Sequence, residues 1–141
     1  MIKVFLDTNI LIYLFEDSGP RGARALEIVS ALAARKDYLV ISTMTLGEIL
    51  VKPLRAGDEA LAEQYRRFLR GPEVKLASFD ERAGELFAHI RKDRTVKAPD
   101  AIQLATAASL DCDLFVTNDD RLTRSIVPGI RFIASMERAP L

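Results

Sequence analysis

The part of the chain that decides the fold is residues 2–9, IKVFLDTN, where an apolar run ends directly on the acidic Asp7. The run is nearly continuous in Val, Ile, Leu and Phe, which is typical of a parallel strand buried on both faces. Further strand candidates are residues 38–41, 113–116 and 130–133, with 74–76 as a weaker one.

Helical patterns fill the intervals between these runs. Apolar residues recur at spacings of three and four in residues 22–35, 58–69 and 81–91, which indicates one buried face of an α-helix. Residues 100–110 are almost free of charge, so we expect a central, buried helix there. Because strands alternate with helices, the sequence predicts an α/β fold whose mainly parallel sheet is covered on both sides.

Size and composition exclude several classes of protein. We expect residues 1–141 to form a single domain, since 141 residues suit one compact unit. Lys plus Arg and Asp plus Glu each number 20, which excludes a nucleic-acid binder that works by bulk positive charge alone. Asp7 interrupts the first apolar run, and no run approaches the ~20 residues of a membrane span. We therefore expect a soluble, cytoplasmic protein with no membrane partner.

Cysteine and histidine restrict the choice of metal. The chain has one cysteine, Cys112, and one histidine, His89, too few for an internal disulfide or a thiolate zinc site. A metal would have to be a hard, oxygen-liking ion such as Mg²⁺ or Mn²⁺. We expect Cys112 to be buried, and His89 to lie on the partly exposed side of a helix without a catalytic role.

Acidic residues stand where predicted strands end and predicted helices begin. Asp7 follows the first strand candidate, and Asp119 closes the one at 113–116. A right-handed winding that starts in the middle of the sheet would make these strands neighbours at the switch point, where α/β folds bind ligands. Asp100 begins the buried helix, and Glu48 lies early in the helix after the second strand.

Each acid also has an ordinary structural explanation. Asp7 could cap the helix that follows it, and Asp100 could complement the positive end of its own helix. Asp119 or Asp120 could cap the short segment that comes next.

Glu48 has the strongest structural alternative. Residues 45–48, TLGE, fit the capping box S/T-x-x-E, and Lys52 stands four residues further on as an ion-pair partner. Converging carboxylates, however, repel one another unless protons or a cation compensate them. Divalent ions with oxygen ligands do so, and they promote phosphodiester hydrolysis by activating water and stabilising developing oxyanions.

Four segments resemble the motifs of PIN-domain ribonucleases, and their order and separations are similar to those of the small VapC-type toxins. These segments are residues 7–9 (DTN), 45–49 (TLGEI), 99–105 (PDAIQLA) and 116–119 (VTND). The resemblance extends from residue 2 to about residue 133. Leu122 departs from the family pattern, in which an aromatic residue is common at this place.

The resemblance implies a three-layer α/β/α sandwich with a central parallel sheet, and metal-dependent cleavage of RNA. It implies Asp7 and Asp100 as the main ligands of Mg²⁺ or Mn²⁺. Asp119 would complete the acidic cluster, directly or through water. Glu48 would bind metal or position the attacking water.

The resemblance also implies supporting residues around these acids. Asn9 and Thr117 would hold the carboxylates in place, the role that orients metal ligands in proteins. Either Asp119 or Asp120 could face the pocket. We prefer Asp119 because it follows residues 117–118 in the family's pattern.

RNA phosphates need cations around an acidic pocket. Residues 91–97 are the densest basic stretch, in which Arg94 and Lys97 are candidate RNA contacts, although a solvated connection between helices is an equal alternative. Arg121 and Arg124 form a second candidate pair. We expect the arginines of residues 66–70 on the outer face of a helix. Aromatic residues total 7% without tryptophan, so no stacking platform for bases is indicated.

The leading hypothesis is a Mg²⁺- or Mn²⁺-dependent endoribonuclease that acts as the toxin of a VapBC-type pair. Its partners would be RNA, a cognate antitoxin and a second copy in a homodimer. Alternatives are a housekeeping PIN ribonuclease and a non-catalytic PIN-like module that docks an arginine-bearing peptide. An aspartyl-phosphate protein is less favoured, because the haloacid-dehalogenase pattern needs a second Asp where this chain has Asn9.

Overall fold

The computed structural model describes residues 1–141 and contains one five-stranded sheet in the order β3-β2-β1-β4-β5. Every neighbouring pair of strands is parallel, so the predicted parallel sheet is confirmed. The strands are β1 Lys3–Leu6, β2 Tyr38–Ser42, β3 Val74–Ala77, β4 Leu114–Thr117 and β5 Phe132–Ser135.

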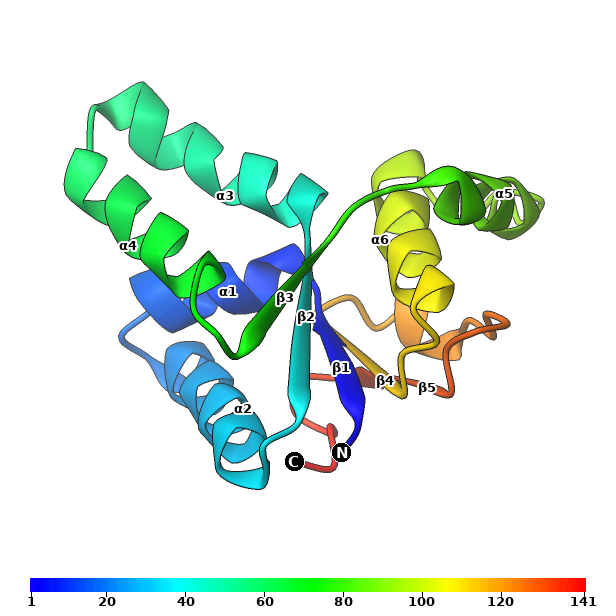
Figure 1. The fold of residues 1–141 in the computed structure, drawn as a ribbon, viewed down its shortest axis with the longest axis horizontal. Coiled ribbons are helices and arrows are strands. Elements are labelled where there is room, and N and C mark those ends of the chain that lie inside the picture. Colours follow the sequence, from blue (N-terminus) through cyan, green and yellow to red (C-terminus); the bar gives the residue numbers. More distant parts are fainter.

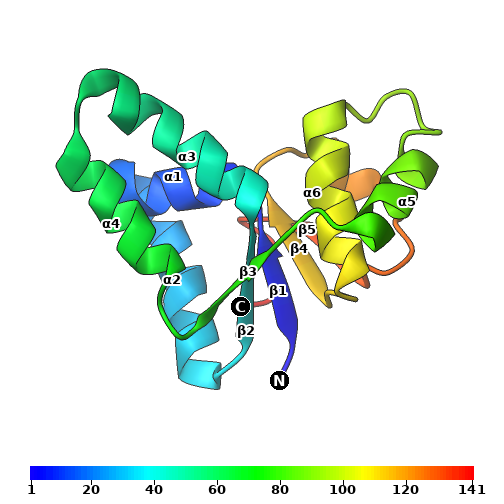
Figure 2. The same cartoon turned by 45° about the horizontal axis from the view of Figure 1, so that its top comes forward.

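Helices cover both faces of the sheet, which confirms the α/β/α sandwich. In Figures 1 and 2, α1–α4 lie on one side of the strands, and α5 and α6 lie together on the other. The helices are α1 Thr8–Glu16, α2 Pro20–Arg35, α3 Thr43–Ala56, α4 Glu59–Leu69, α5 Glu81–Ile90 and α6 Ala98–Ser109, with a short 3₁₀ helix, η1, at Leu122–Arg124. None of these helices combines the length and the apolar character needed for a membrane span.

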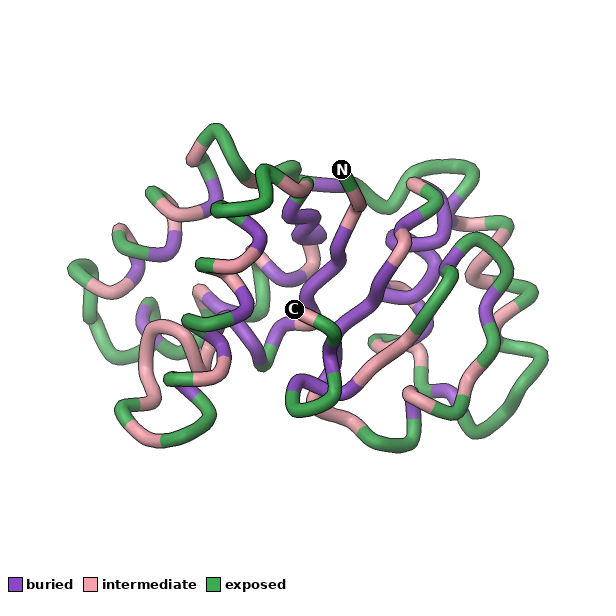
Figure 3. The backbone as a smooth tube through the Cα atoms, turned by 90° about the horizontal axis from the view of Figure 1, so that it is seen from below, coloured by how far each residue is buried: buried purple, intermediate pink, exposed green.

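The two faces of the sheet have separate cores because successive side chains of a strand point to opposite faces. Val4 and Leu6 of β1 pack with α1–α4, whereas Phe5 packs with α6. On that second face the rings of Phe5 and Phe115 stack with centroids 5.0 Å apart. Figure 3 shows the buried strands at the centre and exposed turns around the rim.

The order of the strands reverses between β1 and β4. Their register pairs Phe5 with Phe115 and Leu6 with Val116, and the backbone N–H of Asp7 donates to the carbonyl of Val116 at 2.9 Å. The predicted neighbour relation of these two strands is therefore confirmed. The carboxyl ends of both strands open onto the same side of the sheet.

The last strand begins two residues later than predicted, at Phe132 instead of Ile130. Gly129 turns the chain with φ +99°, and a Cβ at this position would lie 2.7 Å from the carbonyl oxygen of Ala108. Ile130 is consequently buried against the α6 side of the core before the chain enters the sheet. Cys112 is buried, as expected, and His89 is exposed on α5.

Candidate functional site

A polar pocket of about 400 Å³ opens at the carboxyl ends of β1 and β4. No hydrophobic residue lines it. The four acids singled out from the sequence all line this one pocket, together with a fifth. The lining residues are Asp7, Thr8, Asn9, Glu48, Pro99, Asp100, Gln103, Asn118, Asp119 and Asp120.

Asp7 caps α1 and faces the pocket at the same time. Its Oδ1 accepts a hydrogen bond from the backbone N–H of Thr8 at 2.9 Å, and its Oδ2 accepts one from the Thr117 hydroxyl at 2.9 Å. Thr117 in turn accepts from the backbone N–H of Asp119 at 3.0 Å. The Thr117 hydroxyl thus ties the end of β1 to the loop after β4. The ordinary capping explanation for Asp7 is correct, and it does not remove the side chain from the pocket.

The acids of the pocket perturb one another. Burial raises the pKa of Asp7, and the charges of Asp100 and Glu48 raise it further. Hydrogen bonds from Thr117 and Thr8 act in the opposite direction on this pKa.

The pKa of Asp100 is also raised, first by burial and then by the charge of Asp119. Arg121 and Lys97 partly offset that effect. Like charges that raise each other's pKa in this way are stabilised by a cation placed between them.

The structure supports neither structural explanation of Glu48, the capping box or the ion pair with Lys52. The cap of α3 is Ser42, whose hydroxyl accepts from the backbone N–H of Thr45 at 3.0 Å, so the capping box at Thr45 was a wrong interpretation. Lys52 pairs with Glu16 at 3.0 Å instead of with Glu48. The predicted box failed because the helix begins one turn earlier, directly at the end of β2.

Glu48 is instead held from the other side of the pocket. Its Oε1 accepts a hydrogen bond from the Thr8 hydroxyl at 2.6 Å. Thr8 is in the first turn of α1, next to Asp7. The contact therefore connects Glu48 of α3 to the first turn of α1, directly after Asp7.

Gln103 is the residue that the sequence analysis missed. It lies on α6, is only 3% exposed, and donates from Nε2 to the hydroxyls of Thr8 at 2.9 Å and Thr45 at 2.8 Å. Its Oε1 accepts from the Ser42 hydroxyl at 2.5 Å. The available signal was a single amide in an otherwise apolar stretch of the buried helix.

These contacts determine the direction of each hydrogen bond. The Thr8 proton goes to the Glu48 carboxylate, so in the 2.8 Å contact between Thr8 and Thr45 the Thr45 hydroxyl is the donor. Thr8 then accepts twice, from Gln103 and Thr45, which uses both lone pairs of its oxygen. A fully satisfied buried network of this kind fixes one arrangement of its members. It ends on Glu48, which it holds toward the pocket.

Asp119 is paired with a cation inside the chain. Arg121 approaches it with both Nε and Nη2, at 3.1 and 2.9 Å from the two carboxylate oxygens. These bonds lower the pKa of Asp119. Asp119 also accepts from the backbone N–H of Arg121 at 2.9 Å, which is the turn-capping role considered as its alternative. Asp120 is exposed on the same pocket, directly beside Asp119.

The remaining sequence candidates differ in their surroundings. The Asn9 side chain is exposed and lines the pocket together with the acids. Lys97 precedes α6, and its charge lowers the pKa of Asp100, which places it beside the acids. Arg121 lines a second, larger cavity next to the pocket, whereas Arg94 is exposed and lines neither.

The donor set of the pocket fits a hard divalent ion, because carboxylate, amide and hydroxyl oxygens are what Mg²⁺ and Mn²⁺ prefer. No three Asp, Glu, His or Cys side chains already lie in a metal-binding arrangement. Mutual repulsion of the acids and the pairing of Asp119 with Arg121 both act against such an arrangement. Coordination by several of these carboxylates therefore needs side-chain rotation.

Comparison with known proteins identifies the family. Residues 4–125 match the model of the PIN domain, so the chain belongs to the PIN domain family. No curated protein matches the chain.

Solved structures with a similar fold come from toxin–antitoxin systems. A chain of a toxin–antitoxin complex from Klebsiella pneumoniae is 29% identical, with a TM-score of 0.68 over 90% of this chain and 94% of that one. VapBC2 from Rickettsia felis, bound to a DNA fragment from its promoter, is 16% identical, with a TM-score of 0.76 over 95% and 98%. VapC20 from Mycobacterium tuberculosis, described as a sarcin–ricin loop cleaving toxin, is 18% identical, with a TM-score of 0.68 over 91% and 98%.

Proposed function

We propose that the chain is a divalent-metal-dependent endoribonuclease and the toxin of a VapBC-type toxin–antitoxin pair. The observation that carries this proposal is the single pocket at the switch point, which collects the acids of β1, α3, α6 and the β4 loop without any hydrophobic lining residue. Membership of the PIN domain family supports the nuclease activity.

Each acid has a distinct role in this proposal. Asp7 and Asp100 would hold Mg²⁺ or Mn²⁺, and Asp119 would complete the set directly or through water. A bound ion would supply the positive charge that stabilises the phosphate in the transition state and activates water. Glu48, oriented by the Thr8 hydroxyl, positions the attacking water and takes up its proton.

The reaction is hydrolysis of a phosphodiester bond. Water adds to phosphorus, the bond from phosphorus to the 3′ oxygen breaks, and the 3′ oxygen takes up a proton from solvent. The products carry a 5′-phosphate and a 3′-hydroxyl, as the family resemblance implies. Thr117 keeps the Asp7 carboxylate directed at the pocket through its 2.9 Å hydrogen bond. Each Asp7 oxygen accepts one hydrogen bond and keeps a further lone pair that could bind the ion.

The toxin role rests on the similar structures. The Klebsiella protein, at 29% identity over 90% of this chain, belongs to a toxin–antitoxin complex, and a cognate antitoxin would cover the acidic pocket of this chain. The chain would act on cytoplasmic RNA and form a homodimer. A reading frame for a small DNA-binding antitoxin beside its gene would separate this role from that of a housekeeping PIN ribonuclease.

The test of the activity is RNA cleavage by the purified protein in Mn²⁺ and in EDTA. Cleavage in Mn²⁺ should stop in EDTA, and Asp7→Asn and Asp100→Asn should each remove it. Asp58→Asn is the matched control, because Asp58 caps α4 as Asp7 caps α1 but lines no acidic pocket. Unchanged cleavage by both site variants would reject the assignment of the site.

The second candidate is a non-catalytic module whose acidic pocket docks an arginine of a partner peptide. The contact of Arg121 with both oxygens of Asp119 favours it, because the pocket already accepts a guanidinium group. Calorimetric titration with Mg²⁺ and Mn²⁺ distinguishes the two functions. Absence of binding at millimolar concentrations would support the module.

A further inference from the structure

A cavity of about 940 Å³ lies beside the acidic pocket, and Asp100 and Asp119 line both. Its other walls come from α5, from the connection between α5 and α6, from Leu104 of α6, and from residues 121–128. The volume is in the range of about 300–1,000 Å³ that is typical of sites for small organic ligands. A substrate bound at the acids therefore has this cavity directly next to its reacting phosphate.

The walls of the cavity combine two kinds of surface. Leu86, Ile90, Leu104 and Val127 supply an apolar side. Ile126 also lines the cavity, although it is 96% exposed and contributes little to the core. An apolar wall of this kind can pack against the face of a flat ring.

Two cations of this cavity are free to bind anions, whereas Arg121 is paired with Asp119. Lys92 and Arg124 line it, and neither forms an ion pair within the chain. Asp93, the acid beside Lys92, is occupied by the backbone N–H and hydroxyl of Thr95 at 2.9 and 2.6 Å.

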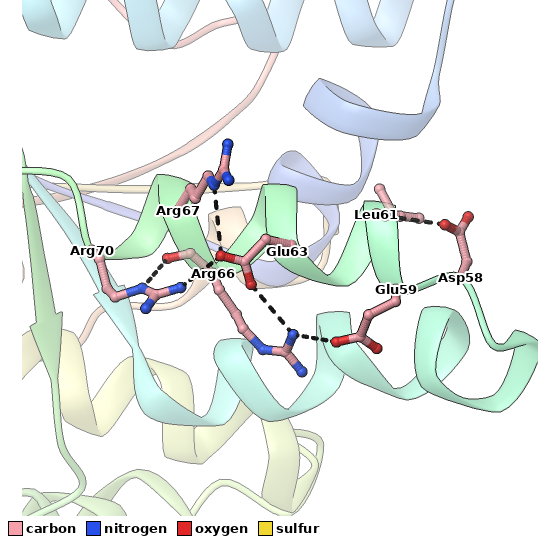
Figure 4. Close-up of polar contacts among 7 residues, drawn as sticks. All are labelled: Asp58, Glu59, Leu61, Glu63, Arg66, Arg67 and Arg70. Atoms are coloured by element: carbon pink, nitrogen blue, oxygen red, sulfur yellow. Dashed lines mark hydrogen bonds and ion pairs between the residues drawn. The ribbon is translucent and has the colours of Figure 1, made fainter.

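The arginines of α4 show the opposite arrangement. Figure 4 shows Arg66 bound to Glu59, with an N–O distance of 2.7 Å, and Arg70 bound to Glu63 at 3.1 Å. Glutamates of the same helix therefore already neutralise these guanidinium groups. Phosphates gain more from Lys92 and Arg124, whose charges have no such partner.

We propose that this cavity is the subsite for the nucleotide next to the scissile phosphate, a proposal that rests on the proposed nuclease function. The base of that nucleotide packs on the apolar wall beside Ile126, and Lys92 and Arg124 contact the neighbouring phosphates. A base reaches this wall only when it is unstacked and unpaired.

Binding of fluorescein-labelled hexauridine in EDTA tests the cations without cleavage. Lys92→Gln combined with Arg124→Gln should weaken binding roughly tenfold and reduce the slope of log K against log salt by about 1.4, since each phosphate contact to a single strand contributes about 0.7. Arg55→Gln combined with Arg67→Gln removes the same charge from residues outside both cavities. Equal binding by the two double variants would overturn the subsite.

A hexauridine with one abasic ribose tests the apolar wall. Loss of the base should weaken binding to the wild-type chain roughly tenfold, the scale expected when part of one base is buried against apolar side chains. In Ile126→Ser the same loss should be much smaller. Leu26→Ser is the control, because Leu26 is 57% exposed and lies on α2, away from the cavity. An abasic penalty that is the same in Ile126→Ser as in wild type would contradict the proposal.

Cleavage of RNA in Mn²⁺, measured in parallel, separates this proposal from the proposed function. If the wild type cleaves RNA while the Lys92/Arg124 variant binds and cleaves normally, the subsite is wrong and the nuclease assignment stands. If the wild type cleaves no RNA but hexauridine binding depends on these cations and on Ile126, the subsite stands and the nuclease assignment fails.

Discussion

Replacement of Gln103 by leucine tests whether the buried amide positions the acidic pocket. The amide makes three hydrogen bonds, to Thr8, Thr45 and Ser42. Each such bond contributes about 0.5–1.5 kcal/mol net, and a buried polar group left without a partner costs about 1–3 kcal/mol. Gln103→Leu keeps a side chain of similar size and removes all three contacts.

The expected loss in the free energy of unfolding lies near the lower end of the summed contributions of these three hydrogen bonds. Thr8 and Thr45 still contact each other at 2.8 Å, and Ser42 can donate to Thr45 at 3.2 Å. We therefore expect the free energy of unfolding to fall by about 2–3 kcal/mol. For a chain of this length that corresponds to a decrease in Tm of roughly 5–10 °C.

The assay is thermal unfolding combined with cleavage kinetics. Without Gln103 the Thr8 hydroxyl is less constrained, so Glu48 is positioned less well and kcat should fall about tenfold. KM should stay nearly unchanged, since the Gln103 side chain is only 3% exposed and its amide is occupied by Thr8, Thr45 and Ser42. Gln103→Glu should destabilise the fold more than Gln103→Leu, because it sets a carboxylate against the oxygens of Thr8 and Thr45.

Gln64→Leu is the matched control, since Gln64 is exposed on α4 and its loss should change stability by no more than about 0.5 kcal/mol. Equal unfolding midpoints for Gln103→Leu and Gln64→Leu would refute the reasoning. A change in KM without a change in kcat would also refute it, because a positioning residue would not act on substrate binding alone.

Three further predictions concern the pocket and the fold. Mg²⁺ at 100 times its Kd should stabilise the wild-type chain by about 2.7 kcal/mol, a rise in Tm of roughly 5–10 °C that should be absent in Asp100→Asn and is readable by thermal unfolding. The raised pKa of Asp7 means that its ionised form destabilises the metal-free fold: the cost is present above the folded-state pKa and is relieved as pH falls through it toward the unfolded value. The excess stability of Asp7→Asn over wild type in EDTA should therefore shrink as pH is lowered from 7, and a constant difference would contradict this. Gly129→Ala should destabilise the fold by more than about 1 kcal/mol in urea unfolding, because Gly129 has φ +99° and an added Cβ would lie 2.7 Å from the carbonyl oxygen of Ala108. Gly84→Ala should instead stabilise the fold by about 0.5–1 kcal/mol, because Gly84 lies inside α5 with open space around it.

The central strands of the sheet were predictable from the sequence, and the edge strand β5 was less predictable. β1, β2 and β4 are buried on both faces, so their composition alone separates them from helices and loops. The sequence analysis began β5 two residues too early, because Ile130 is apolar but is not part of the strand. Ile130 packs in the core on the α6 side of the sheet, and the chain joins the sheet only after the turn at Gly129.

The acidic residues of the site were predictable from position, and their partners were not. A parallel sheet brings the ends of its strands to one edge, which is why Asp7 and Asp119 could be placed together. Local spacing suggested the wrong partner for Glu48. Lys52 stands four residues further on in the sequence, but in the structure it forms an ion pair with Glu16. Glu48 is held by Thr8, forty residues away in the chain.

The sequence alone determined the order of buried strands and the place of each acid at a strand or helix end, because burial pattern and local spacing depend only on residues that are close together in the chain. Tertiary structure decided which hydroxyl orients which carboxylate, that Gln103 links three elements, and that Lys92 and Arg124 stay unpaired beside a cavity. Those relations depend on distances between segments far apart in the chain, and such distances exist only once the helices have packed on the sheet.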